Sequence, residues 1–540
     1  MRPRPRQRAR GLGIAVGAIL PLAFSGCGGS SSPPVSVTGP AVPGRLPPAR
    51  TTPLRSIFQA DVALHEDPAR TLDTMRALGA DTVRLILPWG QLGPFVSIAP
   101  DPASPTPPPA FRAADPAAYP AAGWASYDTI LRDAHDRGMA VDLTLGPPPP
   151  LWARGPGDPG HPVHTQWRLN VAAFGQWVRA VATRYSGHYR DAAGRLLPRV
   201  SLWSVWNEPN FGPDIAPQTT AAGVDVSPVI YRGMVDAAWT ALRATGHGTD
   251  TILIGELAPY GESFGNPGSF GYMVPLRFLR SLYCVGPGLR RLTGSAATQL
   301  GCPPAGDPSR FRAAHPGLFA ASGLSLHPYP QGPPSVVIPG EPDYANLASL
   351  PKVESTIDAI FRTYGSSRQI PLWSTEFGVH TDPPETAYSI SPAQAADYLN
   401  QSEYLTWRDP RLRSYDQYLL EDAPSGEFAT GLEFAGGRPK PGYAAYRMPL
   451  YLPVDRRSGR TPLELWGAVR PARYASGVQR VALQFRPSGA GAFRTIRVVS
   501  LPAGSVYFDV LQRFVDAGSV RTAWRSPNGR LLLSRTAQIS

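Results

Sequence analysis

Two glutamates occupy short polar motifs that directly follow apolar runs of the chain. Glu208 lies in SVWNEPN at residues 204–210, and Glu376 lies in STEFG at residues 374–378. Paired carboxyl groups can cleave a glycosidic bond when one is kept neutral to protonate the leaving oxygen and the other is ionised to attack the anomeric carbon. This chemistry requires the two glutamates to flank one bond, so the elements that carry them must bring them face to face.

From about residue 56, short apolar runs alternate with longer amphipathic stretches, which is typical of parallel strands joined by crossover helices. We predict strands at residues 56–62, 82–89, 140–146, 200–209, 251–259, 323–329, 371–378 and 414–422. We predict helices at residues 68–80, 124–138, 165–187, 229–246, 272–283, 344–365 and 393–407, with a short final helix at 439–447. This order fits an α/β fold, a (β/α)8 TIM barrel over residues 53–455 with inserted loops.

Counting the strands gives the two glutamates a common place in this barrel. Glu208 ends the fourth strand and Glu376 ends the seventh, on opposite sides of the barrel, so their side chains can face each other across its mouth. A separation of about 5 to 5.5 Å gives retention of configuration, whereas a wider gap admits water and gives inversion. The alternative is a pair of polar strand caps. A third strand-end acid, Glu256 in GELAP, either binds substrate or caps its strand.

Four motifs on different strands resemble the retaining glycoside hydrolases of clan A. They are WNEPN on the fourth strand, TEFG on the seventh, HPY on the sixth and Arg84 inside the second. Within the clan they are similar to families 5 (cellulase-like) and 39 alike, over roughly residues 53–450. The resemblance implies a double displacement through a covalent intermediate. No CxxC or HExxH spacing predicts a metal site, and we expect no cofactor.

The resemblance also implies a role for each matching residue. Glu208 would be the acid/base and Glu376 the nucleophile, and Asn207 would hold the 2-hydroxyl of the sugar whose bond is cut. Arg84 and Tyr329 would donate hydrogen bonds to the nucleophile and keep it ionised. The alternative for Arg84 is that it only pairs with a buried acid.

Four further residues complete the predicted site. His327 would orient the site or touch the substrate, and a purely structural role is the alternative. The indole rings of Trp89, Trp206 and Trp373 are candidates for a platform on which sugar C–H faces stack. Trp206 and Trp373 could instead pack beneath the site.

The eighth strand departs from the pattern of the clan. It reads QYLLEDAP, with Tyr418, Glu421 and Asp422 where many members of the clan place a tryptophan. Glu421 or Asp422 could bind sugar hydroxyls in its place. The loop after the third strand reads GPPPPLW, where some relatives carry a histidine. Both departures concern the choice of substrate more than the reaction.

The N-terminal sequence predicts export. A basic segment MRPRPRQRAR precedes a short apolar segment GLGIAVGAILPLAF and the tripeptide SGC, which together predict a signal peptide over residues 1–27. The residues before Cys27 resemble a bacterial lipoprotein cleavage box, which implies lipid attachment at Cys27. Phe24 replaces the usual leucine, so ordinary secretion stays open. Residues 28–52, rich in Pro, Ser and Gly, predict a flexible linker.

Export also bears on the two remaining cysteines, and the net charge bears on nucleic-acid binding. In an oxidising compartment Cys284 and Cys302 are expected to form a disulfide, with two unpaired thiols as the alternative. The net charge is +12, but all 52 cationic residues except Lys352 and Lys440 are arginines, scattered along the chain and often next to acids. Without a clustered basic patch, we expect no nucleic-acid binding.

The chain changes character near residue 460. Six short runs with turn residues between them predict a small β-sandwich-like accessory domain over residues 460–540, with strands at 463–471, 478–487, 493–502, 505–514, 519–527 and 530–539. This domain either binds glycan through Trp466, Tyr507 and Trp524 or packs against the barrel as an appendage. The alternating pattern buries such rings, which favours the appendage.

The sequence therefore predicts an exported monomeric glycosidase, either lipid-anchored at the outer face of the membrane or secreted. It would hydrolyse O-glycosidic bonds of an extracellular or cell-envelope oligo- or polysaccharide, β-linked or of the arabinose type. An envelope transglycosylase would use the same residues and differ in its acceptor. A non-catalytic glycan-binding barrel is a further alternative, against which the presence of both glutamates argues.

Overall fold

The computed structural model describes residues 45–48, 50–93, 96–157, 166–263, 265–303, 307–387, 390–459 and 461–540. The predicted signal peptide, the predicted lipid attachment at Cys27 and most of the predicted linker lie outside the described residues. No helix in the described part of the chain has the length and apolar character needed to cross a membrane.

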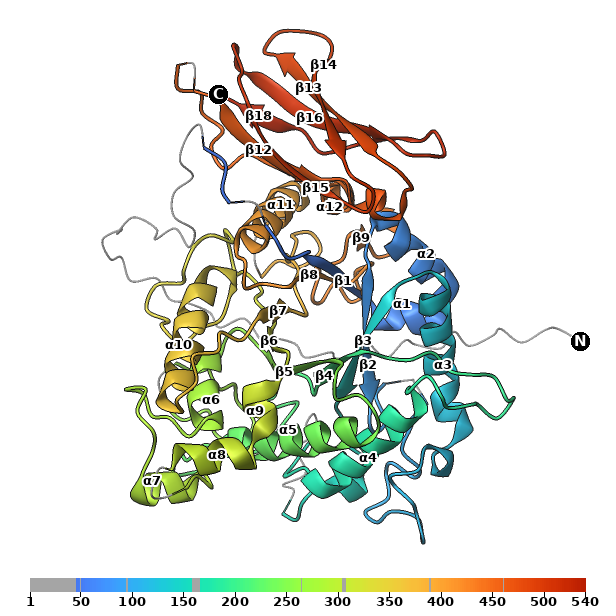
Figure 1. Ribbon diagram of the computed structural model, residues 1–540, viewed down its shortest axis with the longest axis vertical. Coiled ribbons are helices and arrows are strands. Elements are labelled where there is room, and N and C mark those ends of the chain that lie inside the picture. Colours follow the sequence, from blue (N-terminus) through green and yellow to red (C-terminus); the bar gives the residue numbers. More distant parts are fainter. Residues whose placement is uncertain are drawn as a thin grey trace, which may run out of the picture.

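Eight parallel strands form a barrel in the middle of the molecule (Figure 1). They are β1 (Arg55–Gln59), β2 (Thr82–Pro88), β3 (Ala140–Gly146), β4 (Leu202–Val205), β5 (Thr251–Leu257), β6 (Gly323–Leu326), β7 (Leu372–Ser374) and β8 (Ser414–Tyr418). Each strand from β1 to β6 pairs with the next in sequence, and β8 pairs with β1. Two backbone hydrogen bonds link the segments around β7 and β8: Tyr418 N–H donates to the Phe377 carbonyl at 2.7 Å, and Arg413 N–H donates to the Leu372 carbonyl at 2.9 Å. The predicted barrel is confirmed.

Helices surround the strands (Figure 1). They are α1 (Asp61–Glu66), α2 (Pro68–Leu78), α3 (Ala121–Asp136), α4 (Val171–Arg184), α5 (Ser227–Ala244), α6 (Pro275–Leu282), α7 (Gly294–Gln299), α8 (Pro308–Ala314), α9 (Pro316–Ala320), α10 (Leu350–Thr363), α11 (Pro392–Arg408) and α12 (Pro441–Arg447). Short 3-10 turns are η1 (Pro116–Ala118), η2 (Leu151–Ala153), η3 (Leu347–Ser349) and η4 (Arg470–Tyr474).

Local signals explain where several of these helices begin and end. The side chains of Asp67, Asn170 and Ser391 cap α2, α4 and α11 by accepting a backbone N–H of the first turn. Gly79 ends α2 with φ at 87°, and a Cβ on it would lie 2.3 Å from the backbone carbonyl carbon of Arg470. Only glycine meets both the left-handed conformation and this close approach.

The long connection between β5 and β6 contains α6 to α9 and one disulfide. Cys284 and Cys302 are bonded, with their Cα atoms 5.9 Å apart, as the sequence predicts. Both cysteines are buried against the apolar core. The disulfide therefore closes a loop on the outer layer of the barrel rather than at its mouth.

The residues 450–540 form two antiparallel sheets with a shared apolar core. The first contains β11 (Leu450–Tyr451), β12 (Leu463–Ala468) and β15 (Tyr507–Gln512). The second contains β13 (Gln479–Pro487), β14 (Arg494–Leu501), β16 (Gly518–Arg525), β17 (Leu531–Leu533) and β18 (Ala537–Ile539). A hairpin of β9 (Glu433–Phe434) and β10 (Arg438–Pro439) belongs to neither. The C-terminal domain thus starts at β11, before residue 455.

A buried ion pair joins the C-terminal domain to the barrel. Arg470 Nη2 lies 2.7 Å from Glu403 Oε1 on α11, and both side chains are almost wholly buried. Tyr507 donates its hydroxyl to the same oxygen at 2.8 Å. A second pair, Arg473 with Asp81 at 2.7 Å, lies just before β2. The domain is therefore attached where the barrel strands begin, opposite the mouth.

The aromatic residues proposed for glycan binding take part in this packing. Trp466 and Trp524 are buried, and Tyr507 is held by Glu403. Trp466 stacks on Tyr507 with ring centroids 5.7 Å apart. The two tryptophans are buried and the half-buried Tyr507 is engaged by Glu403 and Trp466, which supports the interpretation of the domain as an appendage.

We predict that Glu403→Gln destabilises the protein by about 3–5 kcal/mol, because Arg470 would remain buried without its negative partner. The double variant Glu403→Leu with Arg470→Met removes both charges and should cost much less. Urea unfolding followed by tryptophan fluorescence measures both. If the single variant were as stable as the parent, the ion pair would not hold the domains together.

Candidate active site

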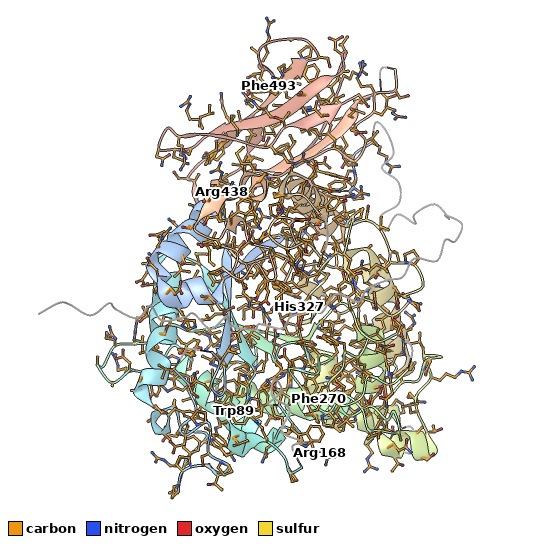
Figure 2. All side chains as sticks on the ribbon, turned by 180° about the vertical axis from the view of Figure 1, so that it is seen from behind. Trp89, Arg168, Phe270, His327, Arg438 and Phe493 are labelled. Carbon is orange, nitrogen blue, oxygen red and sulfur yellow. A yellow bond between two sulfur atoms is a disulfide. The ribbon has the colours of Figure 1, made fainter. Side chains whose placement is uncertain are left out.

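Six side chains from β2 and β5 and from the segments that follow β4, β6 and β7 converge at the mouth of the barrel: Arg84, Glu208, Glu256, His327, Tyr329 and Glu376. Figure 2 shows His327 near the centre of the barrel, far from Phe493 of the C-terminal domain. All except Glu256 belong to the site predicted from the sequence. The sequence left Glu256 undecided between substrate binding and capping.

The two predicted catalytic glutamates face each other. One carboxylate oxygen of Glu208 lies within 4.8 Å of one of Glu376. Their side chains are 14% and 9% exposed, so both can still be reached from outside. This upper limit lies below the 6.5–9.5 Å or so that separates the carboxyl groups of inverting glycosidases, which leaves the shorter spacing of retaining ones, about 5–5.5 Å, as the nearer match.

Arg84 links the residues around this pair. Its Nη1 donates to Glu376 Oε1 at 2.5 Å and also to Gln59, at the end of β1. Its Nη2 donates to Glu256 Oε2 at 2.8 Å and to Asn207 Oδ1 at 2.9 Å. Arg84 therefore does pair with a buried acid, but it binds the predicted nucleophile at the same time.

The second oxygen of Glu376 is held by Tyr329. The Tyr329 hydroxyl donates to Glu376 Oε2 at 3.0 Å, while Arg84 holds Oε1. Arg84 and Tyr329 therefore hold both oxygens of Glu376 and fix the orientation of its carboxyl group. Arg84 and Tyr329 thus stand where their predicted roles require.

His327 lies between three carboxyl groups. Its Nδ1 is 2.8 Å from Glu208 Oε1 and 3.5 Å from Glu376 Oε2, and its Nε2 is 3.0 Å from Glu256 Oε2. Burial alone would lower the pKa of His327, but the neighbouring carboxylates outweigh it and raise the pKa to about 10. The imidazole is therefore part of the charge balance of the site.

Glu208 has the properties of a proton donor. Burial raises its pKa, and the hydrogen bond from His327 opposes this increase. Because Glu208 and His327 are in contact, the proton of this pair belongs to both groups. The pair can deliver that proton to a leaving oxygen at a pH where an ordinary glutamate has already lost it.

The backbone at the ends of β4 and β5 is strained. Trp206, Glu208 and Glu256 have φ values of 70°, 36° and 48°, in the left-handed region that is unfavourable for such residues. Glu208 N–H donates to the Glu256 carbonyl at 3.0 Å, and Asn210 bonds both the carbonyl and the N–H of Ala258. These bonds hold the two strand ends in the conformation that turns both glutamates inward.

Asn207 lies beside the pair, as predicted. Its Oδ1 accepts from Arg84, and its Nδ2 donates to Asp214 Oδ2 at 2.8 Å. Each atom can form a second hydrogen bond, so Asn207 retains capacity for a sugar hydroxyl. Burial, reinforced by the nearby charge of Glu208, raises the pKa of Asp214 well above its usual range.

The three predicted platform tryptophans do not present their rings at the mouth. Trp89 has no exposed area and stacks on Trp177, with centroids 5.4 Å apart. Trp206 is also fully buried, and its Nε1 donates to the Asp214 carbonyl at 3.0 Å. Trp373 lies with the barrel-interior residues Ile57, Leu202 and Leu253, three positions before Glu376. All three pack beneath or beside the site.

The acids after β8 are engaged by the protein. Asp422 is buried and paired with Lys440, with 2.7 Å between Oδ2 and Nζ, so it is not free to bind sugar as predicted. Glu421 is exposed and accepts from Gly436 N–H at 2.6 Å, at the β9–β10 turn. Tyr418 is buried below the mouth.

Phe428 is an aromatic residue at the mouth that the sequence did not single out. It is half-buried, and its ring meets those of Tyr329 and Tyr418 edge to face, at 5.4 and 5.3 Å between centroids. It comes from the loop after β8, where no strand periodicity marks it. Asp214 was missed for the same reason, because it lies in the loop after β4.

A metal ion would fit this site poorly. Oxygen and nitrogen atoms of Glu208, His327 and Glu376 lie close enough to face one cation. However, Arg84 and Tyr329 already donate to Glu376, and His327 carries positive charge. An added cation would meet two cationic side chains at close range.

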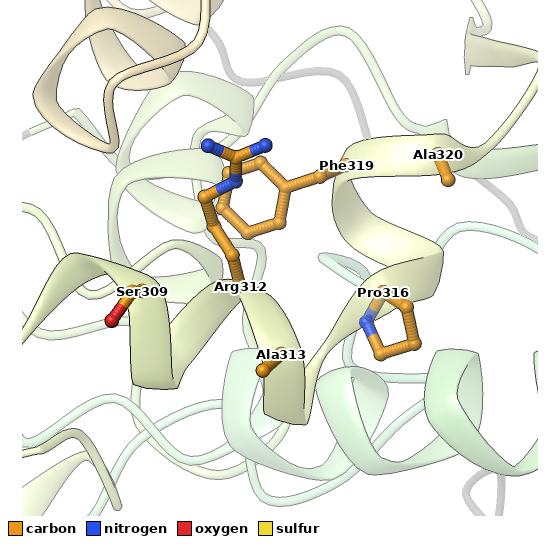
Figure 3. Close-up of a pocket in the computed structure, with 6 residues that line it drawn as sticks. All are labelled: Ser309, Arg312, Ala313, Pro316, Phe319 and Ala320. Atoms are coloured by element: carbon orange, nitrogen blue, oxygen red, sulfur yellow. The ribbon is translucent and has the colours of Figure 1, made fainter.

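A surface pocket elsewhere on the barrel is unrelated to these residues. It lies between α8 and α9 and is lined by Ser309, Arg312, Ala313, Pro316, Phe319 and Ala320 (Figure 3). The Arg312 guanidinium lies 5.8 Å from the centre of the Phe319 ring. None of these residues ends a barrel strand, so the pocket is not part of the site.

Comparisons with known proteins find similar structures only. No protein-family model matches the sequence, and no curated protein matches it. A glucosidase from Croceicoccus marinus is 13% identical, with a TM-score of 0.47 over 92% of this chain and 98% of that one. A family 39 glycoside hydrolase from the gut symbiont Bacteroides cellulosilyticus WH2 is 15% identical, with a TM-score of 0.45 over 85% and 81%. The GH39 enzyme from Xanthomonas axonopodis pv. citri is 12% identical, with a TM-score of 0.45 over 92% and 96%.

Family 39 is one of the two families that the sequence motifs resemble. Because the identities and TM-scores are low, we base the proposed function on the motifs and on the side chains of the site.

The charge balance of the site predicts how stability depends on pH. The pKa of His327 is raised from 6.5 to about 10, so its stabilising effect is complete below pH 6.5 and is lost as the pH rises through 10. Burial would raise the pKa of Glu256, but Arg84 and His327 outweigh it and lower the pKa from 4.5 to about 2. Its effect is complete above pH 4.5 and is lost as the pH falls through 2.

Urea unfolding at a series of pH values therefore should show a stability that declines above pH 6.5. In the His327→Gln variant, the free energy of unfolding should decline less between pH 6.5 and about 10 than in the parent. Parallel curves for parent and variant would show that His327 carries no extra proton in the folded protein.

Proposed function

We propose that the protein is a retaining glycoside hydrolase that cleaves O-glycosidic bonds by double displacement. The observation that carries the proposal is the pair of Glu208 and Glu376, with carboxylate oxygens within 4.8 Å at the barrel mouth. The reaction needs one carboxyl group that donates a proton and one that attacks, and the environments of the two groups differ accordingly. Burial raises the pKa of Glu208, whereas Arg84 and Tyr329 donate to both oxygens of Glu376.

In the first step Glu376 attacks the anomeric carbon while the bond to the leaving oxygen breaks. Glu208 gives its proton to that oxygen, so the aglycone leaves as an alcohol and the sugar stays as an ester of Glu376. His327, 2.8 Å from Glu208, lies beside the carboxylate that this step creates.

In the second step water replaces the aglycone. Glu208 accepts a proton from the water as the oxygen attacks the anomeric carbon, and Glu376 leaves as a carboxylate. Two inversions give net retention. Asn207, held between Arg84 and Asp214, is placed to bond the 2-hydroxyl, an interaction that strengthens in the transition state.

The substrate we propose is an oligo- or polysaccharide outside the cytoplasm. The basic and apolar N-terminal sequence ending in SGC supports export, either with lipid attachment at Cys27 or as a secreted protein. The disulfide between Cys284 and Cys302 fits an oxidising compartment. The motifs resemble enzymes of clan A, which supports a β-linked or arabinose-type glycan of the cell envelope or its surroundings.

Substituting the two glutamates tests the proposal. We expect Glu376→Ala to abolish cleavage, and Glu208→Ala to lower kcat by about 10² to 10⁴-fold on substrates with poor leaving groups. With an activated aryl glycoside, Glu208→Ala should keep its first step and be rescued by azide. The control is Asp136→Ala, an exposed acid at the end of α3, which should cleave like the parent. Equal activity of all variants across a glycoside panel would refute the assignment.

The stereochemistry of the product provides an independent test. Proton NMR during hydrolysis should show that the first product has the anomeric configuration of the substrate, because the narrow carboxylate gap favours a covalent intermediate. Inversion would contradict the mechanism. The same spectra at high concentrations of an acceptor sugar would distinguish hydrolysis from glycosyl transfer.

A further inference from the structure

We propose that Glu256 is a positioning residue whose buried negative charge holds His327 against Glu208 and keeps a proton on the Glu208–His327 pair. The inference rests on the proposed function for its catalytic meaning. The charge on His327 can nevertheless be measured without any turnover, so the two proposals can fail separately.

The hydrogen bonds of Glu256 are concentrated on one oxygen. Oε2 accepts from Arg84 Nη2 at 2.8 Å and from Thr375 Oγ1 at 2.9 Å, and it lies 3.0 Å from His327 Nε2. Oε1 is buried and has no hydrogen-bond partner among the described residues. The backbone N–H of Glu256 donates to Ser325 Oγ at 2.9 Å. The carboxylate is thus fixed with one oxygen between two cationic side chains.

This arrangement connects both halves of the catalytic pair. Arg84 binds Glu256 and Glu376, and His327 contacts Glu256 and Glu208. With Nε2 at Glu256, the imidazole ring must direct Nδ1 to Glu208. A buried carboxylate without such partners would be highly unfavourable, so the two cations and Glu256 stabilise one another.

Burial makes several other acids around the site harder to ionise. The groups that face the cluster from its neighbouring elements are Arg84, Glu208, Glu376, Asp61, Asp142, Asp214, Asp416, Tyr329 and Tyr418. Burial raises the pKa of Asp142 to about 7 and that of Asp214 and Asp416 well above their usual range. Glu256 is the exception, since Arg84 and His327 outweigh its burial and lower its pKa. Glu376 also acts on His327, with its Oε2 3.5 Å from Nδ1, but Glu256 is the carboxylate that contacts Nε2, on the far side of the ring from Glu208.

The charge of Glu256 has a definite effect on proton transfer. A nearby negative charge makes His327 and Glu208 release their protons at higher pH. Without that charge, the pair loses its shared proton at lower pH and can no longer protonate a leaving oxygen there. The pH above which kcat/KM falls, the alkaline limb of its pH profile, should then be lower.

Glu256→Gln separates charge from geometry. The glutamine carbonyl oxygen can accept from Arg84, His327 and Thr375 in place of Oε2, and its amide nitrogen takes the place of Oε1. We expect the titration midpoint of His327, measured by ¹⁵N NMR of the ring and assigned with His327→Gln, to fall by about one pH unit or more. The alkaline limb of kcat/KM should shift in the same direction.

Thr375→Val is the matched control. It removes one donor to the same oxygen without changing any charge. It should lower kcat but leave both the His327 midpoint and the alkaline limb where they are in the parent. If Glu256→Gln instead lowered the rate equally at every pH and left the His327 midpoint unchanged, Glu256 would be merely structural and the proposal would be wrong.

The parent protein alone also tests the inference. If Glu256→Gln did not fold, a His327 midpoint at or below the ordinary 6.5 in the parent would overturn the proposal, and a midpoint well above it would support it. Failure of the parent to cleave any glycoside would refute the proposed function and leave this measurement intact.

Discussion

Arg84 is a fully buried guanidinium whose charge the barrel mouth must balance. It donates to Glu376 from β7, Glu256 from β5 and Asn207 from β4. Burying the Arg84 guanidinium would be strongly unfavourable if one of these acceptors were removed. The ends of three strands are therefore held by hydrogen bonds to one side chain in the middle of the barrel. The stability of this region and the orientation of the predicted nucleophile, Glu376, depend on the same hydrogen bonds.

The barrel interior below the mouth contains further buried acids. Asp142 and Asp416 are buried acids, and burial raises the pKa of each. Asp416 accepts from Phe377 N–H at 3.2 Å, directly after Glu376 in the chain, and Asp142 accepts from Ser204 at 3.0 Å. These groups contribute hydrogen bonds that position the strand ends, and burial makes their carboxyl groups harder to ionise than an exposed aspartate.

The strands and the facing glutamates could be predicted because their signals are local. Apolar runs mark each strand, and strand order alone places the ends of β4 and β7 opposite each other. The directions of Trp206 and Glu256 could not be predicted, because left-handed φ values of 70° and 48° break the alternation of side chains at these strand ends. Asp422 was misjudged because its partner Lys440 follows 18 residues later, and only the folded chain brings them together.

The contacts of the C-terminal domain and the loops at the barrel mouth lie at opposite ends of the barrel. Arg470 and Arg473 bind where the barrel strands begin, whereas the loops that would meet a glycan follow the strand ends. The two ion pairs lie outside the loops that follow β1 to β7, so changes in those loops need not alter them. A lineage carrying this architecture can therefore acquire new sugar preferences by loop replacement without first rebuilding its domain interface, and a designer grafting loops onto this barrel has the same freedom.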